Sequence, residues 1–265
     1  MFSNSKYQLR HLRFSVTLLT LLMLASTQSL RADSLISVAF KAPNSFGQSP
    51  NISGPESAAT SANPLFGAAN VWNNLDFTFG GLTTNPAFTN LDASTGAATG
   101  VNFSISGTVL PVDLFPFIPT PDPLRSTFIA WNSNAGGSPA GESTSISWTL
   151  TGLAPNSTFD LFIYGSRADQ NRSFDMTIEG TTLNIPTFMS TSSQPPDGVL
   201  FAQIVSDASG TISGVGTGIG SDVGNANEAN WSGFQLLQVP EPSSLVLLGT
   251  GFLGLLGTFK KKLSR

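Results

Sequence analysis

Alternation of apolar and polar residues along the middle of the chain is the feature that most constrains its fold. Segments 101–105, 145–150, 157–165 and 173–180 each put every second residue on one apolar face, as with Ile146, Trp148 and Leu150. A period of two with one apolar face is typical of half-buried antiparallel strands. Segments 198–207 and 233–239 also read as strands, and no part of the body shows a convincing helical period.

The connections between these segments carry turn and loop signals. Residues 151–158 contain a glycine, a proline and an asparagine, which favour turns. Segment 110–124 is expected to be a long surface loop, because each proline lacks the amide donor that a central strand needs. Segment 210–231 should begin as a strand and continue as a loop, and 44–64 should be irregular. The sequence therefore predicts an all-β fold, a single jelly-roll-like β-sandwich over residues 33–238.

The N-terminal segment has the pattern of a secretory signal peptide. Lys6, Arg10 and Arg13 precede an apolar run at 14–25, which is too short to span a membrane comfortably. No ideal small-residue cleavage site follows, so the boundary is expected between Ser26 and Asp33, and residues 1–32 are assigned as the signal peptide helix. An uncleaved N-terminal anchor is the alternative.

The C-terminal segment, 239–265, combines prolines, an apolar run and a basic end. Residues 243–259 carry no charge, and as a helix they would extend about 25 Å, near the lower limit for a transmembrane span. Lys260, Lys261 and Lys262 follow, and a basic flank is retained on the cytoplasmic side of a membrane. A buried C-terminal helix is the alternative, and the abrupt basic flank argues against it.

Pro240, Glu241 and Pro242, the apolar span and the lysine cluster together resemble the PEP-CTERM sorting signal of Gram-negative bacteria. The family's basic cluster is usually arginine, whereas this chain has lysine. The resemblance implies recognition of the Pro-Glu-Pro motif by exosortase, a membrane protease-transferase that removes the span. It also implies a Gram-negative host that makes exopolysaccharide. The protein would be anchored in the inner membrane before processing, and would then be at the cell surface or extracellular.

Charge and composition exclude several functions for the body. Residues 33–239 hold 4 basic and 15 acidic residues, a net charge of −11, so the body has no basic field to attract nucleic acid. The chain has no cysteine, and its one histidine, His11, lies in the signal segment. A Ser-His-Asp triad, a Cys-His pair and the usual zinc ligand sets are therefore excluded from the body, and no enzyme and no cofactor are predicted.

Carboxylates leave two minor alternatives open. A glycoside-active enzyme would need two facing carboxylates, one of them desolvated, and the candidates are Asp76, Asp92, Asp160, Asp169, Asp175 and Glu179. None sits in a diagnostic motif, so they are expected to be solvated surface acids. Oxygen donors at alternate positions of 222–228 raise structural calcium as the other alternative, although the segment lacks the EF-hand pattern.

Three tryptophans and one loop are the remaining candidate binding elements. Trp72, Trp131 and Trp231 each lie beside asparagine or serine, as in sugar recognition, although indole rings also close the ends of sandwich cores. Loop 165–174 carries Arg167 and Arg172 with Asp169 between them, and is expected to be a hairpin tip, solvated and salt-bridged unless it binds a ligand. The predicted function is an exported, non-enzymatic cell-surface or extracellular-matrix protein. A carbohydrate-binding module for exopolysaccharide is the first alternative, and a glycoside-active enzyme is the second.

Overall fold

The computed structural model describes residues 35–41, 71–77, 81–113, 127–132, 141–165, 172–186, 198–219, 221–222, 225–226 and 228–239. Within these ranges the chain forms strands and turns and contains no helix. None of the described residues therefore belongs to a helix capable of crossing a membrane. The predicted signal peptide, the apolar span at 243–259 and the irregular segment at 44–64 lie outside the described residues.

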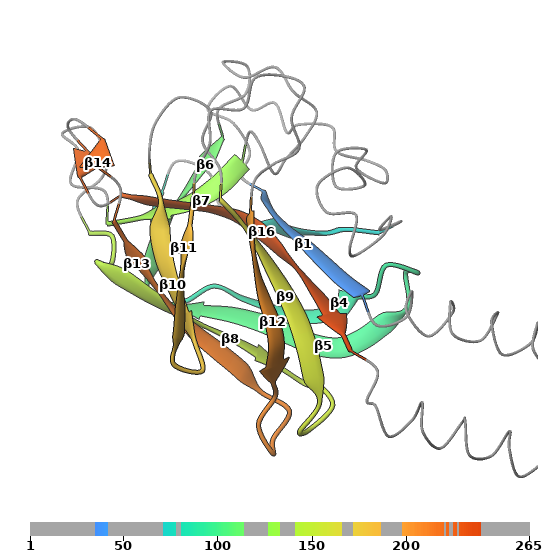
Figure 1. Ribbon diagram of the computed structural model, residues 1–265. Helices are drawn as coiled ribbons and strands as arrows, with labels where there is room; N and C mark the ends of the chain where they lie inside the picture. Colours follow the sequence, from blue (N-terminus) through green and yellow to red (C-terminus); the bar gives the residue numbers. More distant parts are fainter. Residues whose placement is uncertain are drawn as a thin grey trace, which may run out of the picture.

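The first sheet brings together the first and the last strands of the body (Figure 1). Its strands, in spatial order, are β12 (Gly198–Val205), β9 (Thr158–Gly165), β16 (Ala229–Gln238), β7 (Thr127–Trp131), β6 (Thr108–Asp113) and β3 (Thr83–Thr84). Strand β1 (Leu35–Lys41) pairs antiparallel with β16, and β2 (Asn73–Asp76) pairs parallel with β1.

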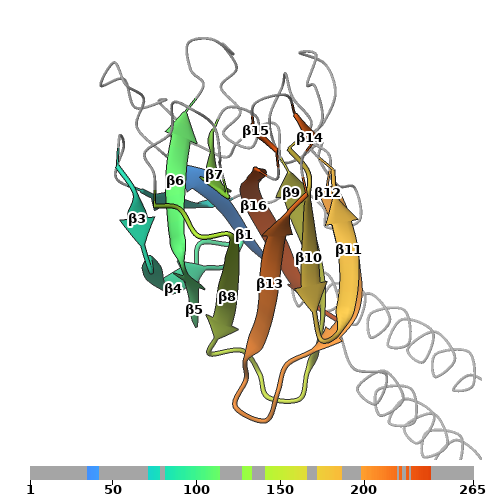
Figure 2. The same ribbon diagram turned by 90° about the vertical axis from the view of Figure 1, so that its left-hand side faces the viewer.

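The second sheet is antiparallel and packs against the first (Figure 2). Its strands, in spatial order, are β11 (Thr181–Ile185), β10 (Phe174–Ile178), β13 (Ile212–Gly218), β8 (Ser145–Thr151), β5 (Ala98–Ser106) and β4 (Ala87–Asp92). A short hairpin follows β13, formed by β14 (Ser221–Asp222) and β15 (Asn225–Ala226). The two facing sheets confirm the prediction of an all-β sandwich.

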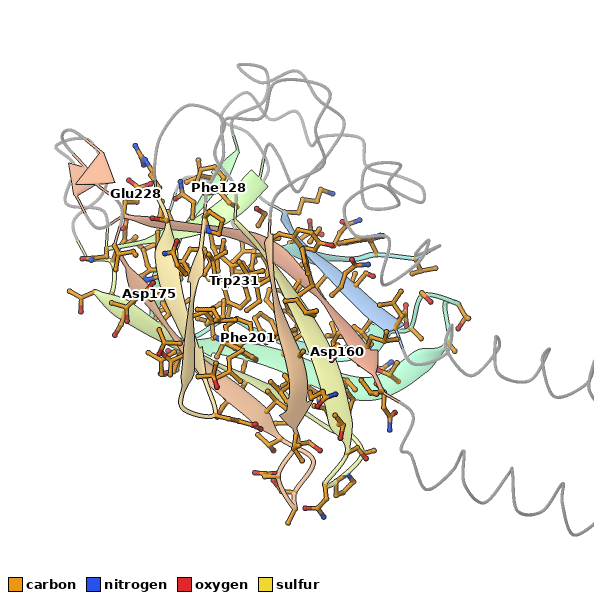
Figure 3. All side chains as sticks on the ribbon, in the orientation of Figure 1. Phe128, Asp160, Asp175, Phe201, Glu228 and Trp231 are labelled. Atoms are coloured by element: carbon orange, nitrogen blue, oxygen red, sulfur yellow. The ribbon has the colours of Figure 1, made fainter. Side chains whose placement is uncertain are left out.

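The inner faces of the two sheets form one hydrophobic core. Trp231 lies between them (Figure 3), with Phe40 of the first sheet at 4.9 Å and Trp148 of the second at 6.0 Å between ring centroids. The glycines of β13 make room for these rings. A Cβ at Gly214 would lie 2.7 Å from the Trp148 ring, and one at Gly216 would lie 2.8 Å from the ring of Trp131. The glycine content of this strand therefore follows from the size of the facing indoles.

Strand β16 is central to the first sheet. One edge pairs with β9, while the other pairs with β7 over residues 229–231 and with β1 over residues 233–237. Leu35 is the register partner of Leu237, so the start of β1 lies beside the end of β16. The two ends of the folded body therefore meet at one end of the sandwich.

Three connections differ from the sequence prediction. Residues 110–113 belong to β6 and are not a loop. Strand β3 pairs only with Thr108 and Val109 of β6. Pro111 therefore lies beyond that pairing, at an edge-like position where proline is tolerated. Loop 165–174 is not the tip of a hairpin, as was expected, because it connects β9 of the first sheet to β10 of the second. Segment 210–231 begins as β13, as expected, but then contains β14, β15 and the start of β16. Residues 114–124 lie outside the described ranges.

Candidate functional site

The three candidate tryptophans are buried and form no surface platform, so they adopt the core packing that the sequence analysis kept beside sugar binding. Trp131 is 0% exposed, Trp231 is 1% exposed and Trp72 is 7% exposed. The first two face the inter-sheet core, where Trp231 donates its Nε1 hydrogen to the carbonyl of Gly233 at 2.8 Å. Trp72 packs against Tyr164 on the opposite face of the first sheet, with ring centroids 6.4 Å apart. None of the three indoles presents a face on which a sugar stacks.

The described candidate carboxylates lie on five separate strands and turns. Asp160 of β9 and Asp175 of β10 alternate with core residues and point outward from different sheets, on opposite sides of Trp231 in Figure 3. Asp76 is highly exposed and forms an ion pair with Lys41 at 3.5 Å. The remaining two are Asp92, at the end of β4, and Glu179, whose Oε1 accepts from the amide of Val205. Asp169 lies outside the described residues.

A buried ion pair closes the end of the sandwich where β9 ends and β10 begins. Arg172 is 3% exposed and Glu228 is 4% exposed, and the guanidinium of one contacts the carboxylate of the other. The Arg172 carbonyl also accepts from the amide of Asn230, at 3.3 Å. Arg172 is therefore part of the packed structure and not of a solvated tip, whereas Arg167 lies outside the described residues. The described residues contain no group of three or more potential metal-ligating side chains.

The outer face of the second sheet is an exposed field of hydroxyl and amide side chains, here called the hydroxyl face. Neighbouring strands place these residues directly opposite one another, as in Ser104 with Thr149 and Thr149 with Ser213. The face consists of Asn102, Ser104, Ser106, Ser145, Ser147, Thr149, Thr151, Asp175, Thr177, Thr182, Asn184, Ser213, Val215 and Thr217. Asp175 is its one charged residue, and Val215, 42% exposed, is its one large apolar residue. The face is therefore nearly neutral and rich in hydrogen-bonding groups.

The outer face of the first sheet is instead largely buried around β1, β9 and β16, and is here called the covered face. Leu35, Ala39, Trp72 and Tyr164 form a second hydrophobic cluster on it. A chain of buried polar groups crosses the cluster: the Tyr164 hydroxyl donates to Gln235 Oε1, and Gln235 Nε2 donates to Ser37 Oγ at 3.0 Å. Ser37 and Gln235 are directly opposite one another on β1 and β16, and both are 0% exposed.

A cavity of about 410 Å³ lies at the end of the sandwich where β1 begins and β16 ends. Among the described residues, its lining is mostly apolar and includes no charged side chain; it is drawn from β1, β5, β9, β16 and the connections 93–97 and 152–154. Val239, the residue after β16, donates its amide hydrogen to the Thr158 carbonyl at 2.9 Å. We call this end of the body, with its cavity, the sorting pole.

Comparison with known proteins identifies the segment that follows the sorting pole. The family model described as the PEP-CTERM protein-sorting motif matches residues 238–262. The match contains Pro240, Glu241, Pro242, the apolar span and Lys260, Lys261 and Lys262. The predicted sorting signal is therefore confirmed, although its residues from 240 onward lie outside the described ranges. A PEP-CTERM signal implies an exported protein that is anchored in a membrane before processing.

Similarity to solved structures is weak. TmCBM61 in complex with β-1,4-galactotriose shares 10% identity at a TM-score of 0.32, with 52% of this chain and 88% of that chain covered. The exo-β-1,3-galactanase from Phanerochaete chrysosporium with galactose shares 11% identity at a TM-score of 0.29, over 58% and 29% of the two chains. A family 35 carbohydrate-binding module from Clostridium thermocellum shares 13% identity at a TM-score of 0.26, over 41% and 90%. No curated protein matches the chain. These similarities carry no argument about function.

Proposed function

We propose that this protein is an exported, non-enzymatic component of the cell surface or extracellular matrix, sorted by an exosortase-like enzyme. One observation carries the proposal: the matched sorting motif begins at Gln238, which is also the last residue of β16. All strands among the described residues precede residue 239, so removal of the apolar span leaves this sandwich complete. The motif is then a temporary anchor, and the body is the part that remains outside the cell.

Two features of the described residues support a non-enzymatic body. The candidate acids are divided between different sheets and loops, and the cavity at the sorting pole has no acid, base or nucleophilic pair in its lining. The body sequence also lacks histidine and cysteine. Structural polar groups instead satisfy one another inside the fold, as in the Arg172–Glu228 pair.

Intact-mass measurement of the exported protein tests the sorting proposal. In a host with an exosortase-like enzyme, the exported form should begin between Ser26 and Asp33 and should lack residues from Ser243 onward. Replacement of Pro240 and Pro242 by alanine should leave the tail attached. The same chain in a host without the enzyme is the control. A mature mass that still includes Lys260–Arg265 in the first host would contradict the proposal.

The hydroxyl face favours binding to a neutral polysaccharide as a second candidate function. A sugar polymer offers hydroxyl groups, which pair with serine, threonine and asparagine side chains without a charge to desolvate. Because the tryptophans are buried, any such contact would depend on hydrogen bonds and on Val215 instead of indole stacking. The protein should be retained on an insoluble neutral glucan in a manner almost insensitive to salt, and Ser147→Lys with Thr217→Lys should abolish retention. Gln203→Lys, on the edge strand β12, is the matched control. Equal retention of both variants would exclude this face.

A further inference from the structure

The sorting motif is attached to the body without a flexible spacer. Strand β16 remains paired with β9 up to Gln238, and the Val239 amide is held by the Thr158 carbonyl at 2.9 Å. Pro240 is the next residue. The folded body is therefore held in place up to the residue immediately before the Pro-Glu-Pro motif.

Chain length limits how far the motif can lie from the body. An extended chain covers at most about 3.6 Å per residue, so Pro242 lies no more than about 11 Å from Val239. An enzyme that encloses Pro240–Pro242 needs contact surface on both sides of the cleaved segment. At this distance it cannot bind the motif without also meeting the sorting pole, unless the end of β16 separates from β9.

The surface that the enzyme would meet is suited to contact with a protein. The cavity of about 410 Å³ lies beside the exit of the chain, with Ile36, Leu236 and Gln238 in its lining. Ala97, Ala98 and Ala154 at its rim are exposed, small and uncharged. Burying such a surface carries little desolvation cost, whereas a charge placed there would have to be dehydrated without a partner.

The register of β1 places the N-terminal junction at the same end. Leu35 is paired with Leu237, and the predicted signal-peptide boundary lies between Ser26 and Asp33, only a few residues earlier. The N-terminal segment and the sorting span are therefore both joined to the sorting pole. While either segment is inserted in the membrane, this end of the body is the one held nearest to it.

We propose that the sorting pole is a docking surface for the exosortase-like enzyme, so that the folded body forms part of the recognised substrate. This inference rests on the proposed sorting function. It adds that the enzyme recognises more than residues 238–262. The enzyme would also contact the cavity formed by β1, the β4–β5 and β8–β9 connections and the end of β16. Processing should then depend on exposed residues far from the motif in the sequence.

A linker experiment separates docking from other effects. Ala97→Glu with Ala154→Glu places two charges on the pole at exposed positions, and Ala87→Glu with Ala202→Glu places two at exposed alanines of β4 and β12, outside the cavity lining, as a matched control. Each full-length chain is expressed in an exosortase-positive host, and loss of the tail is followed by intact mass after a pulse of synthesis. The pole variant should be processed at least fivefold more slowly than the wild type, and the control at the wild-type rate.

Each pair is then repeated with ten glycine and serine residues inserted between Val239 and Pro240. Such a linker has a root-mean-square length of roughly 17 Å, enough for the enzyme to act away from the body. With the linker present, the pole variant should be processed at the same rate as the control variant that carries the same linker. A wild-type rate for the pole variant without the linker would overturn the docking proposal. So would a delay that persists with the linker, because that delay would arise from export or folding. If even the wild type keeps its tail, the sorting function itself fails.

Discussion

The two outer faces of this sandwich both consist of every second residue along their strands, but one is exposed to solvent and the other is largely buried. On the hydroxyl face, outward positions are serine, threonine and asparagine, and they remain in contact with solvent. On the covered face, outward positions include Leu35, Phe162 and Tyr164, and the face is largely buried. The difference shows that one sheet has a single buried side, whereas the other is packed on both sides. Function at the surface is therefore expected from the second sheet and from the ends of the body.

A charge in the middle of the covered face should give the largest effect. Gln235→Lys places an ammonium group where the native amide bridges Tyr164 and Ser37 and is 0% exposed. An uncompensated buried charge costs about 3–5 kcal/mol, and for a domain of ordinary stability that is enough to populate the unfolded state. Urea unfolding followed by tryptophan fluorescence measures this loss. A native-like midpoint would show that the face is open to water.

Removal of one hydroxyl from each face should give a smaller and more selective difference. Tyr164→Phe leaves Gln235 Oε1 without this donor in a buried position, which costs about 1–3 kcal/mol. Thr177→Val removes a comparable hydroxyl, the one that contacts Thr182 at 2.8 Å on the hydroxyl face, where water can replace it. We expect only the tyrosine variant to unfold at clearly lower denaturant. Similar midpoints for the two variants would contradict the comparison.

A charge on the hydroxyl face should have almost no effect on stability. Ser147 is exposed on β8, opposite Ser106 on β5 and Val215 on β13. Substitutions at exposed positions of this kind usually change stability by less than about 0.5 kcal/mol, so Ser147→Lys should melt close to the wild type. A large loss would mean that another part of the protein covers this face. The same variant then serves in the polysaccharide assay without a folding artefact.

The last effect is confined to acidic pH and is expected at the turn that joins the two sheets, between β12 and β13. The Ser209 hydroxyl and the Thr211 amide donate to the carboxylate of Asp207 and hold its pKa below its ordinary value of 3.8. A depressed folded-state pKa stabilises the fold above the unfolded pKa, and this stabilisation is lost as the pH falls through the folded pKa, below about pH 4. Asp207→Asn should therefore unfold at a midpoint that depends less on pH between about 5 and 2 than that of the wild type. Parallel curves for the two proteins would contradict this assignment.

One-sided alternation was enough to predict β5, β8 and β10 of the second sheet, whereas β4 and β11 were not predicted. In β8, Ser145, Ser147 and Thr149 separate the core residues Ile146, Trp148 and Leu150, and the residue pattern matches the observed burial. The sequence of β9 contains a further signal, apolar residues on both faces, which the prediction of a half-buried strand did not take into account. Its outward residues include Phe162 and Tyr164, and apolar side chains on both faces indicate a strand covered on both sides.

The candidate site was predicted less well because it depends on pairing between distant segments. Trp131 and Trp231 have polar sequence neighbours, yet the register places both rings between the sheets, opposite the glycines of β13 or near Phe40. The sorting motif was readable because its parts are contiguous. The pole beside it was not, since its lining comes from residues 36–238 and is assembled only when β1 pairs with β16.

Strand β16 also decides when this protein can fold. It is the last of the described strands to be synthesised, yet it is paired on both edges, and Gln235 bonds to Ser37 across a sequence separation of 198 residues. A chain that emerges from the membrane with its N-terminus first cannot complete the first sheet until residue 238 has crossed. Contacts this distant in sequence also form slowly. Completion of the fold thus reports that the whole body has been translocated, and only a fully exported chain presents both the closed pole and the motif beside it.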